Sequence, residues 1–137
     1  MRVLDTSVIY KWYVDEEDTV KALLLRDDFV KRGVETVIPD FLFLELANAL
    51  RYNPNMEREN VEEIVDNLFE LSLETVVTTP TLTKEALKIA YDYHITVYDA
   101  LYLALAQGLE FEFITADKKL YEKTKTLYLV KYLGDIE

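Results

Sequence analysis

Phe111-Glu112-Phe113-Ile114-Thr115-Ala116-Asp117 is the stretch that decides the fold, because a short apolar run ends there in an acid. Such a run predicts a buried strand over residues 111–115. The chain opens on the same pattern, since Val3-Leu4 leads directly into Asp5. Sites in parallel sheets form beyond the carboxyl ends of the strands, so we expect Asp5 and Asp117 to lie together.

Outward from these two segments, predicted strands and helices alternate along the chain. The strands are predicted at residues 3–4, 36–38, 75–78, 111–115 and 127–130. One helix follows Asp5, and the others are predicted up to residue 32 and over 41–52, 56–73, 81–93, 97–107 and 117–124. Asp40 and Thr96 are the expected N-caps, and Gly33 and Gly108 the expected stops. This alternation predicts an α/β fold in which helices cover both faces of a mainly parallel sheet.

The composition limits the class of protein. The chain has 137 residues, a length that predicts one domain. Its net charge of −11 argues against a general nucleic-acid coat, although it allows an enzyme that meets RNA through divalent cations, or a basic partner. The absence of cysteine excludes disulfides and thiolate metal sites. No apolar stretch is long enough for a membrane span or a signal peptide, so we expect an intracellular, cytoplasmic protein without a membrane partner.

Two further acids interrupt apolar helices. Glu45 is the only charged residue from Phe41 to Leu50, and Asp99 is the only one from Ile95 to Leu109. A buried carboxylate is costly unless it is paired or binds a metal. Four such acids spread along the chain therefore suggest one cation site. Magnesium and manganese prefer oxygen ligands, and such ions can stabilise an in-line phosphoryl displacement.

Simpler roles remain open for each acid. Asp5 and Asp117 could be helix caps alone, or caps and ligands at once. Glu45 and Asp99 could belong to a structural hydrogen bond or a buried ion pair.

Other functional motifs have little support. His94 is the single histidine, and no His-Glu-x-x-His spacing exists, which excludes a zinc protease of that type. Asp92 and the run Asp15–Asp18 are more consistent with solvated faces. There is no Gly-rich phosphate loop, so nucleotide binding of the P-loop or Rossmann type has no support.

Four segments of the chain match sequence motifs of one known family in order and spacing. They are Val3-Leu4-Asp5-Thr6-Ser7-Val8-Ile9, Pro39-Asp40-Phe41-Leu42-Phe43-Leu44-Glu45-Leu46-Ala47-Asn48-Ala49-Leu50, Thr96-Val97-Tyr98-Asp99-Ala100-Leu101-Tyr102-Leu103-Ala104-Leu105-Ala106 and Phe113-Ile114-Thr115-Ala116-Asp117-Lys118-Lys119-Leu120. With these motifs the chain resembles the PIN-domain nucleases, and most closely the small toxin ribonucleases of VapBC-type (type II) toxin–antitoxin pairs. The resemblance covers nearly the whole length.

The resemblance implies a three-layer α/β/α fold, with residues 1–137 forming a single PIN domain. It implies that four catalytic acids hold Mg²⁺ or Mn²⁺, namely Asp5, Glu45, Asp99 and Asp117, and that the hydroxyls of Thr6 and Thr115 support them. The implied activity is endonucleolytic RNA cleavage by a metal-activated water, which leaves 5′-phosphate and 3′-hydroxyl ends. A homodimer and a cognate antitoxin that blocks the site are also implied.

Two alternatives compete with a toxin ribonuclease. One is a non-catalytic PIN-like scaffold that binds a partner protein, although a scaffold has no need of Glu45 and Asp99 in apolar helices. The other is a housekeeping RNA-processing nuclease. Lys11, Lys118 and Lys119 are the bases nearest in sequence to the acidic motifs, and they are candidates for phosphate contacts.

Overall fold

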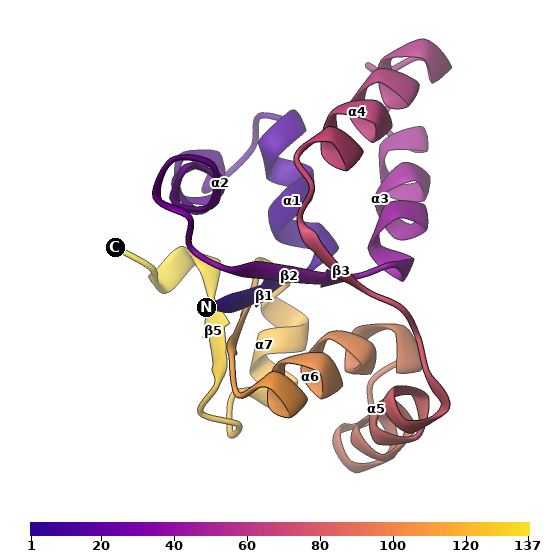
Figure 1. Cartoon of the computed structure of the whole chain (residues 1–137), viewed down its shortest axis with the longest axis vertical. Coiled ribbons are helices and arrows are strands. Elements are labelled where there is room, and N and C mark those ends of the chain that lie inside the picture. The colour runs from indigo at the N-terminus through magenta and orange to yellow at the C-terminus, as the bar shows by residue number, and fades with distance from the viewer.

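A sheet of five parallel strands forms the middle layer of the molecule (Figure 1). The computed structural model describes residues 1–137. The strands are β1 (Arg2–Leu4), β2 (Thr36–Pro39), β3 (Glu74–Val76), β4 (Glu112–Thr115) and β5 (Val130–Tyr132), in the order β3-β2-β1-β4-β5. Every neighbouring pair is parallel. The carboxyl ends of all five strands therefore meet at one edge of the sheet.

Helices form the two outer layers. They are α1 (Thr6–Tyr13), α2 (Thr19–Arg32), α3 (Phe41–Arg51), α4 (Arg58–Glu70), α5 (Pro80–Tyr93), α6 (Val97–Leu109) and α7 (Lys118–Thr124), followed by a 3₁₀ turn at Leu133–Asp135. In Figure 1, α1 to α4 lie above the sheet and α5 to α7 lie below it. The predicted α/β/α architecture is confirmed. No helix combines the length and the apolar character that crossing a membrane requires.

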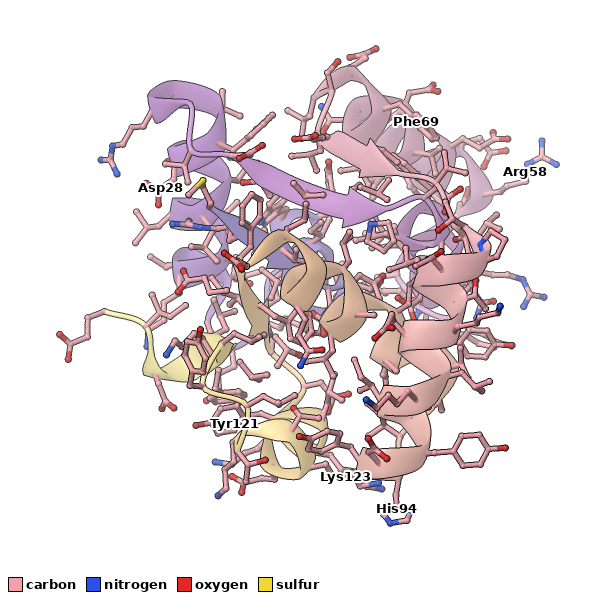
Figure 2. All side chains as sticks on the ribbon, turned by 60° about the horizontal axis from the view of Figure 1, so that its bottom comes forward. Asp28, Arg58, Phe69, His94, Tyr121 and Lys123 are labelled. Carbon is pink, nitrogen blue, oxygen red and sulfur yellow. The ribbon has the colours of Figure 1, made fainter.

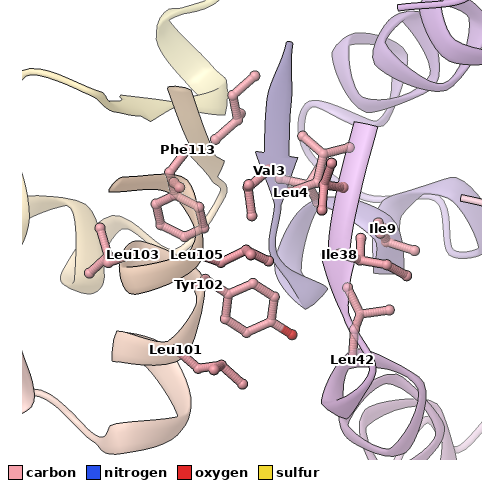
Figure 3. Packing of buried hydrophobic residues seen from close by; sticks show 14 of the residues in the cluster. Val3, Leu4, Ile9, Ile38, Leu42, Leu101, Tyr102, Leu103, Leu105 and Phe113 are labelled. Atoms are coloured by element: carbon pink, nitrogen blue, oxygen red, sulfur yellow. The ribbon is translucent and has the colours of Figure 1, made fainter. Parts of the chain in front are cut away.

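The central strand β1 brings Asp5 and Asp117 to the same edge. Val3 pairs in register with Phe113 of β4, and Leu4 pairs with Ile114. Val3 and Leu4 are fully buried because helices cover both sides of this strand. In Figure 3, Leu105 of α6 and Phe113 lie beside Val3 in the core. Since β1 and β4 are adjacent, the residues that follow them must emerge close together.

Helix α6 has the longest buried run of the helices, and every residue from 100 to 106 is inaccessible to solvent or nearly so. It packs against β1, β2 and β4 on one side and against α5 on the other. Thr96 caps its N-terminus through a hydrogen bond from the Asp99 N–H to Oγ1 at 3.0 Å, as predicted. This burial on two sides explains the nearly continuous apolar sequence around Asp99.

One predicted cap is wrong. Asp40 has helical backbone angles and makes no cap with its side chain, which instead accepts a hydrogen bond from the Thr78 hydroxyl at 3.2 Å. Its N–H donates to Val76 O at 2.9 Å. Asp40 therefore joins β2 to the segment after β3, a contact between residues far apart in sequence.

Several element ends also differ from the prediction, since α4 spans Arg58–Glu70 rather than 56–73 and β3 ends at Val76 rather than at residue 78. Gly108 does not stop α6, which continues to Leu109 and ends where Glu110 adopts a left-handed conformation with φ of 59°. The last strand begins at Val130 rather than at residue 127. Residues 127–129 form a turn instead, because the Val130 N–H bonds to Leu127 O at 3.0 Å.

Candidate active site

All four acids singled out in the sequence line one cavity of about 440 Å³ at the carboxyl edge of the sheet. Asp5 directly follows β1, and Asp117 comes two residues after β4. Glu45 projects from α3 and Asp99 from the first turn of α6. Residues separated by more than a hundred positions thus share one pocket because parallel strands end at one edge.

Asp5 is the most deeply buried of the four acids, with 6% of its surface exposed. It caps α1 by accepting a hydrogen bond from the Val8 N–H at 3.4 Å. The hydroxyls of Ser7 and Thr115 donate to its two carboxylate oxygens at 2.5 and 2.6 Å. The pKa of Asp5 is raised to about 7, chiefly by burial and in addition by the charges of Glu45 and Asp99, while the two hydroxyls oppose the shift.

Glu45 is held by two hydroxyls. The Tyr102 hydroxyl donates to Glu45 Oε1 at 2.7 Å, and the Thr6 hydroxyl donates to the same oxygen. The Thr6 and Tyr102 oxygens are 3.0 Å apart. Burial raises the pKa of Tyr102, and the neighbouring Glu45 carboxylate raises it further, so its phenol stays protonated as a donor. Three helices thereby fix the position of one carboxylate.

Sequence reasoning missed Tyr102 and Ser7 as site residues. Tyr102 comes three residues after Asp99 in α6, a spacing that places both on one helix face. The spacing from Asp99 was the sequence signal for Tyr102, but it was overlooked because the chain has ten tyrosines. Ser7 accepts the Ala116 N–H at 2.8 Å while it donates to Asp5, so it ties α1 to the end of β4.

Asp99 and Asp117 complete the group. Burial raises the pKa of the half-buried Asp99, followed by the charges of Glu45 and Asp117. Asp117 is exposed and caps α7 by accepting the Leu120 N–H at 3.1 Å. Asp5 and Asp117 are therefore helix caps that also line the cavity. None of the six ion pairs in the structure includes any of the four acids, which excludes the buried ion pair considered for Glu45 and Asp99.

The donor chemistry of the cavity fits a hard divalent cation. Its acids offer only oxygen, and neighbouring acids help to raise the pKa of Asp5 and of Asp99, a repulsion that a cation would relieve. No three His, Cys, Asp or Glu side chains are arranged to hold an ion together. Mg²⁺ commonly keeps several waters and takes only one or two carboxylates, so its binding does not require such an arrangement.

The predicted basic residues lie in different places. Lys11 lines the acid cavity but pairs with Glu16 at 3.0 Å. Lys118 points elsewhere, with its Nζ 5.5 Å from the centre of the Tyr132 ring. Lys119 lines a second cavity, which shares Asp99 and Asp117 with the first. Of the acidic run Asp15–Asp18, one residue, Glu16, lines the acid cavity.

Two other residues lie outside the acid cavity. Asp92 is exposed on α5, as a solvated helix face predicts. His94 is an exposed residue at the C-terminal end of that helix, where it adopts a left-handed conformation.

The comparisons with known proteins agree with this fold. The sequence matches the PIN domain family over residues 2–125. It is 29% identical over 129 residues to Ribonuclease VapC3 of Pyrobaculum aerophilum, which covers 91% of this chain and 95% of the relative. It is 23% identical to the VapC ribonuclease of Aquifex aeolicus, which covers 90% of this chain and 91% of the relative. A toxin–antitoxin complex from Klebsiella pneumoniae has a similar fold, with a TM-score of 0.73 at 14% identity, covering 99% of this chain and 100% of that one. The family match spans most of the chain and agrees with the three-layer fold, and it shows that the chain belongs to the PIN domain family.

Proposed function

We propose that this protein is an endoribonuclease that depends on Mg²⁺ or Mn²⁺, and that it is the toxin of a toxin–antitoxin pair. The names of its relatives support the ribonuclease part, since both are called VapC ribonucleases. The observation that carries the proposal is the gathering of Asp5, Glu45 and Asp99 in one cavity with no cationic partner in an ion pair. Acids held close together at a cost in electrostatic repulsion are typical of a catalytic site.

In this proposal the four acids hold the cation and the hydroxyls position the acids. When bound, the cation supplies positive charge that stabilises the phosphate oxygens and activates water for attack on phosphorus. The hydroxyls of Ser7 and Thr115 fix both oxygens of Asp5. Thr6 and Tyr102 fix Oε1 of Glu45 from the side opposite to solvent, since both donors are buried. The carboxylates therefore need little reorganisation when substrate binds.

The first test is cleavage by the purified protein of labelled RNAs, structured and single-stranded, with Mg²⁺, with Mn²⁺ and with EDTA. We expect cutting only with the cations, and products that carry 5′-phosphate and 3′-hydroxyl ends. Asp99→Asn should lower kcat by roughly 100-fold or more, because it removes a charged ligand. Asp92→Asn is the matched control, since Asp92 is exposed on α5 and outside the cavity.

Cleavage that survives in EDTA, or in Asp99→Asn, would overturn the metal-dependent mechanism. A well-folded protein that cuts no RNA under any of these conditions would instead favour a non-catalytic scaffold that binds a partner protein.

The toxin assignment requires a partner and a cellular effect. We expect a homodimer in the cytoplasm, and an antitoxin encoded beside this gene that binds it and blocks the acid cavity. Expression of the protein alone should arrest growth, and co-expression of the neighbouring gene should restore it. Arrest should disappear with Asp99→Asn. Active nuclease without arrest would favour a housekeeping RNA-processing role.

A further inference from the structure

A second, smaller cavity of about 210 Å³ adjoins the acid cavity. Asp99 and Asp117 line both, so these two acids form a shared wall. On its other sides the smaller cavity is lined by Thr96, Lys119 and Lys123, among others. A strand held at the acids can therefore extend into a cavity that two lysines line.

Lys119 and Lys123 differ from the other bases around the acids because neither forms an ion pair. The chain has 15 lysines and arginines, and the six ion pairs use Arg2, Lys11, Lys31, Arg32, Arg58 and Lys125. Of the remaining bases, Lys119 and Lys123 are the ones that line either cavity. They are four residues apart in α7, so they project from one face of that helix.

Contacts within the protein orient Lys123. Its Nζ donates to the His94 carbonyl at the C-terminal end of α5, at 3.3 Å. Lys123 and His94 lie next to each other at the bottom of Figure 2. An ammonium has three donors, so two remain available to a ligand.

Simple neutralisation of the acids does not explain this arrangement. Lysines serving that purpose would lie within ion-pair distance of Asp99 or Asp117, and no ion pair joins them. A protein with a net charge of −11 repels a polyanion unless cations are placed along its path. Two bases beside a cavity of acids supply such a local attraction.

We propose that Lys119 and Lys123 form a phosphate subsite, which binds the RNA phosphodiester next to the one held at the acid cavity. This inference rests on the proposed ribonuclease function. Lysines act on phosphates as point charges, so the subsite positions the strand without reading its bases. The Thr96 hydroxyl lines the same cavity and accepts the Asp99 N–H through its oxygen, which leaves its proton able to donate to the phosphate.

The test compares two charge-reversed pairs with equal change in net charge. Lys119→Glu/Lys123→Glu alters the subsite. Lys84→Glu/Lys88→Glu is the matched control, because these exposed lysines have the same spacing on α5, form no ion pair and line neither cavity. We expect the α7 pair to raise KM for RNA by roughly 10-fold or more with a smaller change in kcat, and the α5 pair to change KM far less.

A neutral pair gives a second measurement that does not depend on introduced repulsion. RNA binding by Lys119→Gln/Lys123→Gln, measured by fluorescence anisotropy in the Asp99→Asn background so that no cutting occurs, should weaken. The slope of log K against log salt should become shallower by about 0.7, since the subsite binds one phosphate and each phosphate contact on a single strand contributes about 0.7. Lys119→Arg/Lys123→Arg should keep both affinity and slope.

The outcomes separate this inference from the proposed function. Equal rises of KM in the α7 and α5 pairs would overturn the subsite. An unchanged salt slope in the glutamine pair would overturn it whether or not the protein cuts RNA. An intact subsite in the binding assay with no cleavage by the wild type would instead count against the nuclease assignment alone.

Discussion

The Tyr102 hydroxyl and Glu45 Oε1 are 2.7 Å apart, and this hydrogen bond joins α6 to α3 at the acid cavity. Thr6 of α1 donates to the same oxygen. These two hydroxyls are the hydrogen-bond donors that orient the Glu45 carboxylate. Tyr102 keeps its proton because burial, together with the adjacent carboxylate, raises its pKa.

Tyr102→Phe should reduce activity more than it reduces stability. The ring stays in the core, where its centre lies 6.1 Å from that of Phe113, so the loss is confined to one hydroxyl. We expect the free energy of unfolding to fall by about 1 kcal/mol. We expect kcat to fall roughly 10-fold, because Glu45 loses one of the donors that orient it. Urea denaturation and steady-state cleavage kinetics measure the two effects.

The matched control for this variant is Tyr128→Phe, since the Tyr128 side chain is 87% exposed and far from the acids. It should leave both quantities unchanged. If Tyr102→Phe retained full kcat, the hydroxyl would be a packing feature of the core and not a positioning group for Glu45.

Thr115→Val should weaken catalysis by acting on Asp5. The Thr115 hydroxyl donates to Asp5 Oδ2 at 2.6 Å, and that bond favours the charged carboxylate. Its loss should raise the pKa of Asp5 above about 7, so the acidic limb of the kcat/KM profile should move to higher pH. At pH near 7 we expect roughly a 10-fold loss of kcat/KM.

Thr36→Val provides the comparison. Thr36 is also a buried strand threonine, but it begins β2, at the edge of the sheet opposite to the acid cavity, and its hydroxyl donates to Val34 O. It should cost stability without moving the pH profile. A profile that shifts equally in both variants would show that Thr115 acts through general stability.

The pKa of Asp5 predicts how stability depends on pH without cations. An exposed aspartate has a pKa of 3.8, whereas folding raises that of Asp5 to about 7. Between these values the folded state binds more protons than the unfolded state, so the free energy of unfolding should fall as pH rises from about 4 to about 7. The fall attributable to Asp5 is at most about 4 kcal/mol.

Asp5→Asn isolates this contribution, because asparagine does not titrate. In EDTA, urea denaturation at several pH values should show the wild type losing stability relative to Asp5→Asn as pH increases. A difference between the two proteins that stays constant from about pH 4 to about pH 8 would contradict the raised pKa of Asp5.

Divalent cations should stabilise the fold as well as support cleavage. If Mg²⁺ or Mn²⁺ binds as proposed, it would relieve the repulsion among the carboxylates only in the folded state, where they share a cavity. Saturation at 100 times Kd would add about 2.7 kcal/mol to the free energy of unfolding. Thermal melts should therefore move upward with either cation and return to the starting value with EDTA.

The cation effect should be smaller in Asp99→Asn, which removes one ligand, and unchanged in Asp92→Asn. A wild-type melting temperature that does not respond to millimolar Mg²⁺ or Mn²⁺ would argue that the cavity binds no cation. An equal rise in both variants would mean that the ion binds elsewhere on this acidic chain.

Local sequence pattern was enough to predict the architecture and the four acids that line the acid cavity. The apolar runs at residues 3–4 and 113–116 each end in an acid, and parallel strands must bring such ends to one edge. Glu45 and Asp99 stood out because a charge inside an apolar helix is costly. Each of these signals involves only a few neighbouring residues, so burial and periodicity are sufficient to detect it. The catalytic roles of these acids stay predictions.

Only the tertiary structure decided which neighbours those acids have. Tyr102 meets Glu45 across 57 positions, and Ser7 accepts the Ala116 N–H across 109. The same is true of Lys123, which reaches the end of α5, and of Asp40, which bonds to Thr78 instead of capping its own helix. Hydrogen bonds of this kind depend on how the layers pack against one another. The periodicity of a single sequence reports which residues are buried, but not which distant donor meets which acceptor.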